Sequence, residues 1–172
     1  NCKKEKHVIA EILYVTSNAL SSQSIYSQSN FFLNLAKYLN EDFNSYDTLL
    51  AENFYKLGDF KKAKKIYNKL SKYGEAFNWY SSKQLTRIFI QQQNKTEALN
   101  LLEKSFNGLL EKGIYETFDY AEFLKNNEKF EESIPFYTNI INQVKKDHPL
   151  YFEATDGRGV AYERIGKWSK AE

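Results

Sequence analysis

The stretch ENFYKLGDFKKAKKIY, which runs from Glu52 to Tyr67, decides the fold of this chain. A short turn from Leu57 to Phe60 separates two runs in which apolar residues recur at helical spacing. Gly58 can adopt the left-handed conformation that ends a helix, and Asp59 can cap the helix that follows. The stretch therefore predicts a helical hairpin, and the rest of the sequence decides whether this hairpin is repeated.

Small residues recur along the chain at the register of Ala63, separated by 34, 35, 35 and 38 residues. These positions, which we call anchors, are Ser29, Ala63, Ala98, Ser133 and Ala171. Twelve residues before each anchor the side chain is again small or nearly so: Ser17, Ala51, Thr86, Ala121 and Gly159. Two helices approach closely where each contributes a small side chain, and a single hairpin cannot cover its own apolar face, so copies stack. The sequence thus predicts an all-α array of antiparallel helix pairs.

The recurring positions resemble those of the tetratricopeptide repeat. The best matches are LLAENFYKLGDFKKAKKIYNKL (residues 49–70) and GRGVAYERIGKWSKAE (residues 157–172). The last stretch is also similar to multi-repeat proteins of alphaproteobacteria. The resemblance implies a right-handed superhelical solenoid that follows a lead-in over residues 1–9. Its expected units are 10–43, 44–77, 79–112, 114–147 and a truncated 152–172, so we expect an uncovered apolar strip around Tyr162, Ile165 and Trp168.

In the tetratricopeptide family the first helix of each hairpin lines a concave groove that binds extended or helical peptides. The resemblance therefore implies a partner-binding groove formed by Tyr14, Asn18, Glu52, Tyr55, Lys56, Lys83, Arg87, Gln91, Phe118, Asp119, Glu122 and Lys125. Within this set, Lys83 and Arg87 form a basic patch with acidic residues on both sides. Each charged residue also has a plain structural interpretation as a solvated side chain or a salt bridge between units.

Composition narrows the function classes. A formal net charge of +2 argues against a nucleic-acid-binding protein, which normally carries a clear basic excess. The only cysteine is Cys2, so the chain can form neither an internal disulfide nor a cysteine-based zinc site. There is no run of eighteen apolar residues that would predict a membrane span. Because the chain has no Met, we expect a piece of a longer protein, from either the cytoplasm or the bacterial periplasm.

Catalytic chemistry has little support in the sequence. Neither His7 nor His148 has an evident nucleophile or metal partner, and no carboxylate pair stands out as a general acid and base. The carboxylate clamp of chaperone-binding family members is not matched, because Tyr14 and Leu49 stand where Lys and Asn are required. We therefore predict that the chain is not an enzyme and has no cofactor. The lysines in residues 61–65 fall on the exposed face of a predicted amphipathic helix, and we expect them to be solvated. Contact of these lysines with an acidic lipid or an acidic protein is an alternative.

The sequence favours a non-catalytic protein–protein interaction scaffold with a peptide or protein partner in its concave groove. A first alternative is a regulatory or targeting module of a larger enzyme or of a cell-envelope assembly protein. An RNA-binding helical repeat is less favoured, since such repeats normally have a more basic face. Lipid modification of Cys2 is an alternative to an inert thiol.

Overall fold

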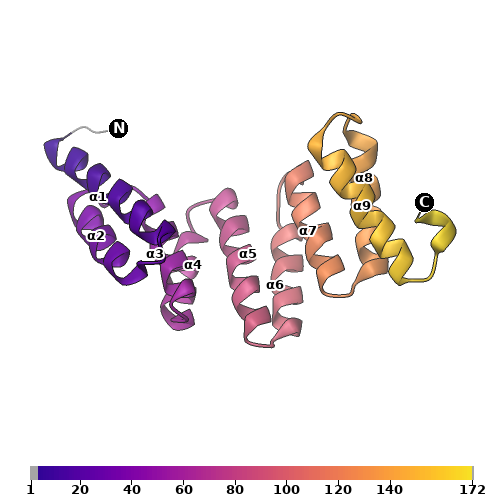
Figure 1. Cartoon of the computed structure of the whole chain (residues 1–172), viewed down its shortest axis with the longest axis horizontal. Coiled ribbons are helices and arrows are strands. Elements are labelled where there is room, and N and C mark those ends of the chain that lie inside the picture. Colours follow the sequence, from indigo (N-terminus) through magenta and orange to yellow (C-terminus); the bar gives the residue numbers. More distant parts are fainter. Residues whose placement is uncertain (1–3, 172) are drawn as a thin grey trace. The chain divides into compact units, whose positions relative to one another are not determined.

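The computed structural model describes residues 4–171, and these residues form nine α-helices, one 3₁₀ turn and no strand (Figure 1). The prediction of an all-α chain of helix pairs is confirmed. The helices are α1 (Glu5–Ser22), α2 (Tyr26–Leu39), α3 (Ser45–Lys56), α4 (Phe60–Leu70), α5 (Glu75–Gln91), α6 (Lys95–Asn107), α7 (Ile114–Asn126), α8 (Phe130–Gln143) and α9 (Pro149–Arg164), followed by the 3₁₀ turn η1 (Trp168–Lys170).

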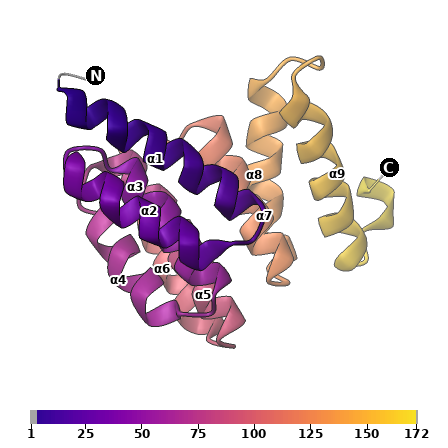
Figure 2. The same ribbon diagram turned by 60° about the vertical axis from the view of Figure 1, so that its left-hand side comes forward.

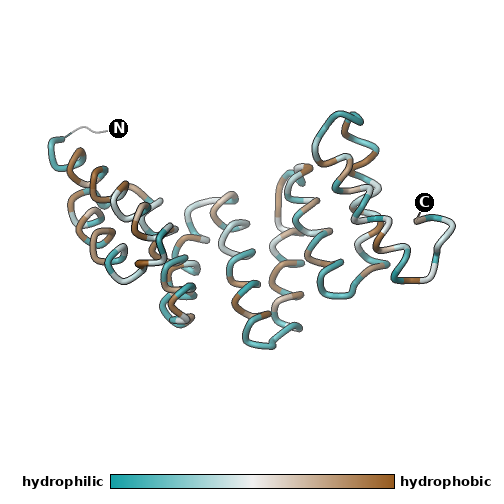
Figure 3. Tube along the Cα trace, viewed as in Figure 1, coloured by the Kyte–Doolittle hydropathy of each residue, from teal (hydrophilic) through white to brown (hydrophobic). Residues whose placement is uncertain are grey.

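The chain divides into two compact units, Asn1–Ala98 and Leu99–Glu172, and each is described by itself. In unit 1 each helix from α1 to α4 packs against the next one along the chain, so the series of contacts ends at α5. In unit 2, α8 packs against both α7 and α9. Figure 2 shows α1 and α2 side by side in unit 1, and Figure 3 shows apolar segments along the helices with mainly hydrophilic turns between them.

Five turns share one backbone conformation, in which a single residue is left-handed. These residues are Ser24, Gly58, Gln93, Glu128 and Gly166, with φ between 61° and 75°. In each turn the next residue donates its backbone N–H to a carbonyl five residues earlier, at 2.8–2.9 Å. This is the bond that closes a Schellman motif at a helix C-terminus. The prediction for Gly58 is confirmed, and Asp59 Oδ1 accepts from the backbone N–H of Lys62 at 3.1 Å.

Eight of the ten small residues of the repeat are buried, as their spacing predicts, whereas Gly159 and Ala171 are half-buried. Ser17, Ser29, Ala51 and Ala63 are fully buried. The hydroxyl of Ser29 donates to the backbone oxygen of Ser17 at 2.8 Å, so the anchor and the small residue twelve positions before it are in direct contact in the first hairpin. Small side chains therefore allow α1 and α2 to approach closely.

Three helices begin earlier than the expected units. α1 begins at Glu5, inside the expected lead-in, because its residues continue the helical pattern of the first unit. α5 begins directly after Gly74, whose positive φ of 117° lets the chain change direction before the helix. α9 begins at Pro149, which suits the first turn of a helix, and His148 Nδ1 accepts from the Leu150 N–H at 3.1 Å. The grouping of the helices into repeat units stays a prediction.

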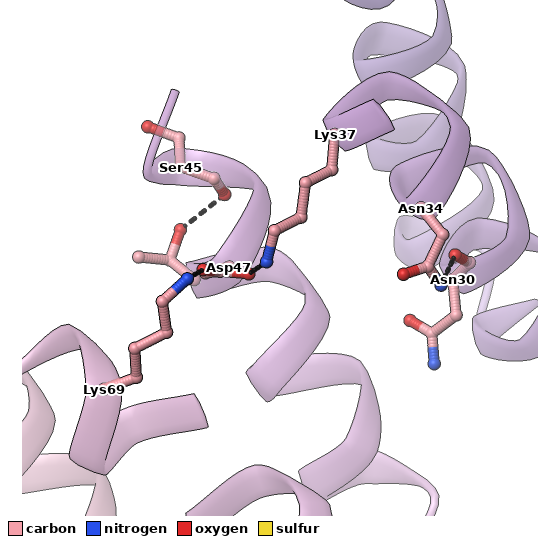
Figure 4. Close-up of polar contacts among 7 residues, drawn as sticks. Asn30, Asn34, Lys37, Ser45, Asp47 and Lys69 are labelled. Carbon is pink, nitrogen blue, oxygen red and sulfur yellow. Dashed lines mark hydrogen bonds and ion pairs between the residues drawn. The ribbon is translucent and has the colours of Figure 1, made fainter. Parts of the chain in front are cut away.

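A buried carboxylate joins three helices of unit 1. Asp47, in the first turn of α3, is 3% exposed and forms ion pairs with Lys37 of α2 and Lys69 of α4, the latter at 3.0 Å (Figure 4). Burial raises the pKa of the Asp47 carboxyl, but the two lysines outweigh burial and hold this pKa below its usual value. The charged form of Asp47 is therefore part of the folded structure.

A hydrogen-bond network joins α3 to both helices of the first hairpin. Asn53 of α3 is fully buried, and its amide nitrogen donates to Ser29 Oγ at 2.8 Å and to Asn30 Oδ1 at 2.9 Å. Its amide oxygen accepts from the Ser21 hydroxyl at 2.6 Å. Because its polar atoms are paired, Asn53 can be buried where α3 meets the first hairpin.

Candidate functional site

Four of the predicted groove residues come together in unit 1. The Arg87 guanidinium of α5 donates from Nη2 to Glu52 Oε2 of α3 at 2.7 Å and lies 3.9 Å from the centre of the Tyr55 ring. Lys56 Nζ lies 4.0 Å from Glu52 Oε1. We call Glu52, Tyr55, Lys56 and Arg87 the Arg87 cluster. Two first helices that are not consecutive in the chain therefore share one charged and aromatic surface.

A buried tyrosine of α4 contacts the carboxylate of this cluster. Tyr67 of α4 is fully buried, and its hydroxyl donates to Glu52 Oε2 at 3.2 Å. Its ring lies 6.1 Å from the ring of Tyr80 in an edge-on arrangement. Burial raises the pKa of the Tyr67 hydroxyl, and the neighbouring Tyr80 and Glu52 raise it further. Tyr67 therefore stays protonated and holds the Glu52 carboxylate in place.

The predicted basic patch is partly neutralised inside the chain. Arg87 is paired with Glu52, which matches the plain interpretation of a salt bridge between neighbouring first helices. The Arg87 side chain is nevertheless 42% exposed, and the Lys83 ammonium lies 5.8 Å from the Trp79 ring. An arginine fixed by a carboxylate and a ring still has guanidinium N–H groups for a ligand, because it carries five donors.

The other predicted residues of unit 1 have different surroundings. Tyr14 packs edge-on against Phe43 and Tyr46, at 5.6 and 5.3 Å between ring centres, so it belongs to the margin of the core. Asn18 is exposed and donates to the backbone oxygen of Tyr14 at 2.9 Å. Gln91 is exposed at the last residue of α5.

Unit 2 repeats the tyrosine–glutamate arrangement. The Tyr137 hydroxyl of α8 donates to Glu122 Oε1 of α7 at 2.6 Å, and Lys125 Nζ lies 2.6 Å from the same oxygen. The Phe118 ring lies 6.2 Å from that of Tyr137. Burial, followed by Glu122, raises the pKa of the Tyr137 hydroxyl. The structure thus brings three of the predicted residues of unit 2 together, while Asp119 is half-buried on the same helix.

The hydroxyl contacts of Tyr67 and Tyr137 were not identified from the sequence. A signal was present, because a glutamate precedes each tyrosine by fifteen residues in the same repeat register. The other two hairpins have Asn18 and Arg87 at the glutamate position and leucine at the tyrosine position. At this register, therefore, a buried tyrosine occurs where a carboxylate is available to accept a hydrogen bond from its hydroxyl.

The two histidines have different surroundings. His148 caps α9 through Nδ1, and His7 is half-buried and lines a cavity of about 250 Å³ beside Tyr14 and Phe43. Within residues 4–171 there is no group of three or more His, Cys, Asp or Glu side chains that could hold a metal ion. In the same part of the chain no helix is both long and apolar enough to cross a membrane. Cys2 lies outside the described residues.

Comparison with known proteins identifies the fold. No protein-family model and no curated protein matches the sequence. Among solved structures, a tetratricopeptide repeat protein from Parabacteroides merdae matches 94% of this chain and 61% of its own, with a TM-score of 0.64 and 20% identity. YrrB, a tetratricopeptide repeat protein with an unusual peptide-binding site, matches over 92% of this chain and 79% of its own, with a TM-score of 0.56 and 19% identity. The chain has the tetratricopeptide-repeat fold.

A further match supports the same fold. MamA from Desulfovibrio magneticus RS-1 matches 98% of this chain and 90% of its own, with a TM-score of 0.64 and 13% identity. The predicted tetratricopeptide-like fold is therefore confirmed. At these identities the tetratricopeptide-repeat fold is shared, whereas ligands and partners belong to each protein separately.

Proposed function

We propose that this chain is a non-catalytic protein-interaction scaffold, and that the first helices of unit 1 bind a peptide segment of a partner at the Arg87 cluster. The carrying observation is the contact of Arg87 with both Glu52 and Tyr55 across α3 and α5. Arginine and tyrosine are enriched where proteins bind one another, because both offer large contact areas and directional donors. The solved fold neighbour with a peptide-binding site supports this mode.

The charges of the cluster indicate the chemistry of the peptide. Glu52 carries one negative charge, whereas Lys56 and Arg87 carry two positive charges, so the cluster has a net positive charge. A carboxylate of the partner can accept from the free donors of Arg87, and Glu52 can accept a peptide N–H. We therefore propose a ligand segment with an acidic residue next to exposed backbone.

The Glu122 region of unit 2 is proposed as a second, separate contact surface. Glu122 is held by Tyr137 and Lys125 and is half-exposed beside Phe118. It offers a fixed acceptor next to an aromatic ring, which suits a polar group of a partner. Because Lys125 already neutralises Glu122, this surface is less charged than the Arg87 cluster.

A random peptide library displayed on phage, selected on the immobilised chain, tests the proposal. We expect enriched peptides to contain an acidic residue and to bind about tenfold more weakly to Arg87→Gln, since one charged hydrogen bond is lost. Lys104→Glu on α6, an exposed position, is the matched control and should leave the affinity unchanged. Failure to enrich any peptide, or equal affinity for the wild type and Arg87→Gln, would contradict the proposed site.

A further inference from the structure

The outer side of α2 carries an exposed apolar stripe. Phe31, Leu35 and Tyr38 are 60%, 40% and 79% exposed, and their spacing of four and three residues places them on one face of the helix. We call these residues the α2 stripe. Monomeric proteins rarely expose a contiguous row of large apolar side chains to water, and such rows mark interaction sites.

Stacking of hairpins does not account for the α2 stripe. The residues at the same repeat register in the other second helices are all exposed as well, so the array covers none of these positions. None of them is a large apolar residue: they are Lys65, Lys69 and Lys72 in α4 and the turn directly after it, Asn100, Lys104 and Asn107 in α6, and Pro135, Asn139 and Asn142 in α8. Among these second helices, the apolar character is therefore specific to α2. We infer that a molecule other than a neighbouring hairpin covers the α2 stripe.

Positive charge lies beside the stripe on one side. Lys37 of α2 and Lys69 of α4 both reach the Asp47 carboxylate of α3, so the α4 lysines lie on the side of α2 where Asp47 is bound (Figure 4). Lys65 on α4 and Lys72, two residues after the end of α4, are exposed, and neither pairs with an acidic side chain among the described residues. The border of the stripe toward α4 is therefore positively charged and available to an acidic partner.

The remaining charges favour a protein over an anionic membrane. The only charged residue of α2 is Lys37, which is already paired with Asp47. The exposed acidic residues Glu41 and Asp42 follow the Tyr38 end of the stripe. An anionic lipid surface would be repelled at that end, whereas a protein helix can place different charges at different borders.

We propose that the α2 stripe, together with Lys65 and Lys72, is a docking surface for an amphipathic helix of a protein partner. The partner helix has apolar residues at the same spacing and acidic residues along the border that faces α4, as in helix pairs matched by apolar seams and flanking charges. This surface lies on second helices, whereas the proposed peptide-binding surface lies on first helices. The two proposals therefore stand or fall separately.

Two designed helical peptides of about 20 residues test this docking surface. They share one leucine stripe and differ only in the flanking residues, which are glutamate in one peptide and lysine in the other. By fluorescence anisotropy with the 172-residue chain, we expect the glutamate peptide to bind at least about tenfold more tightly. The Phe31→Ser/Tyr38→Ser variant should lose that binding, and Lys65→Glu/Lys72→Glu should reverse the preference between the peptides.

Matched controls separate the alternatives. Lys104→Glu, at the same register in α6, should leave binding of the glutamate peptide unchanged. The substituted residues are exposed, and an unchanged helical circular dichroism spectrum verifies folding. Equal binding of the two peptides, or full binding by Phe31→Ser/Tyr38→Ser, would overturn the proposal. So would stripe-dependent binding to phosphatidylglycerol vesicles without peptide binding, or a stripe-dependent dimer in light scattering, since either result identifies a different occupant.

Discussion

Asp47 shows how a single residue can unite several helices. Its carboxylate is almost completely buried at the start of α3, yet it is paired with lysines from α2 and α4 that remain partly in water. Removing one partner of a buried ion pair is costly because the other charges lose their compensation. The partial exposure of Lys37 and Lys69 reduces this cost, because water screens them.

We expect Asp47→Asn to lower the free energy of unfolding by about 1–3 kcal/mol at pH 7. The pKa of Asp47 is depressed in the folded state, so its contribution is complete above the unfolded value of about 3.9 and is lost as the pH falls through the folded value. The wild type should therefore lose more stability than the variant between about pH 5 and pH 2. Urea unfolding at several pH values measures this difference. Asp42→Asn, at an exposed position, is the control, and parallel acid profiles for the wild type and Asp47→Asn would contradict the prediction.

At the scale of elements, the same turn recurs between the two helices of each hairpin. Two of the five left-handed positions are glycine, whereas Ser24, Gln93 and Glu128 adopt the same conformation with a side chain. A non-glycine residue in the left-handed region is strained by roughly 1 kcal/mol. The backbone bond from the following residue is the same in all five turns, so the geometry persists without glycine.

Glycine should therefore stabilise the turn between α7 and α8. We expect Glu128→Gly to raise the free energy of unfolding by about 0.5–1 kcal/mol, because it relieves the strain at φ 67°. The exposed Asn126→Gly variant, inside the last turn of α7, should instead be destabilised by a few tenths of a kcal/mol. Thermal unfolding of the three proteins measures both effects. A lower midpoint for Glu128→Gly than for the wild type would show that its side chain stabilises the turn.

At the scale of the whole molecule, stability is divided among local contacts. The apolar cluster of unit 1 includes Leu33 and Tyr46, and that of unit 2 includes Tyr137 and Ile140. Most helix contacts within each unit join neighbours along the chain, with smaller ones between α1 and α3 and between α7 and α9. In such arrays, stability is close to a sum of terms for each repeat and its neighbours.

A core substitution should therefore have a local effect. Ile140 is 1% exposed, so Ile140→Ala should cost about 2–5 kcal/mol in unit 2 and reduce amide protection in α7, α8 and α9. We expect α1 to α3 to keep their protection in hydrogen exchange measured by mass spectrometry. Leu33→Ala, also 1% exposed, is the reciprocal variant and should reduce protection in α1 to α3 instead. An equal loss in both units from either variant would show that the chain unfolds as one cooperative block.

The sequence by itself determined the helical hairpins, their period and the small contacts between them. These features follow from local rules, since Gly58 ends a helix, Asp59 begins one, and the anchors fall at the spacing of one repeat. It also indicated the first-helix residues from which the Arg87 cluster is built, although their role as a binding site stays a prediction.

Only the tertiary structure decided how those residues are paired and which surfaces are left open. Arg87 meets Glu52 across 35 positions of sequence, and the Tyr67 hydroxyl contacts the same carboxylate from α4. The α2 stripe follows a helical pattern that would equally suit a buried face. Its exposure is set by which side chains the neighbouring helices cover, and that depends on the packing of distant segments rather than on local propensity.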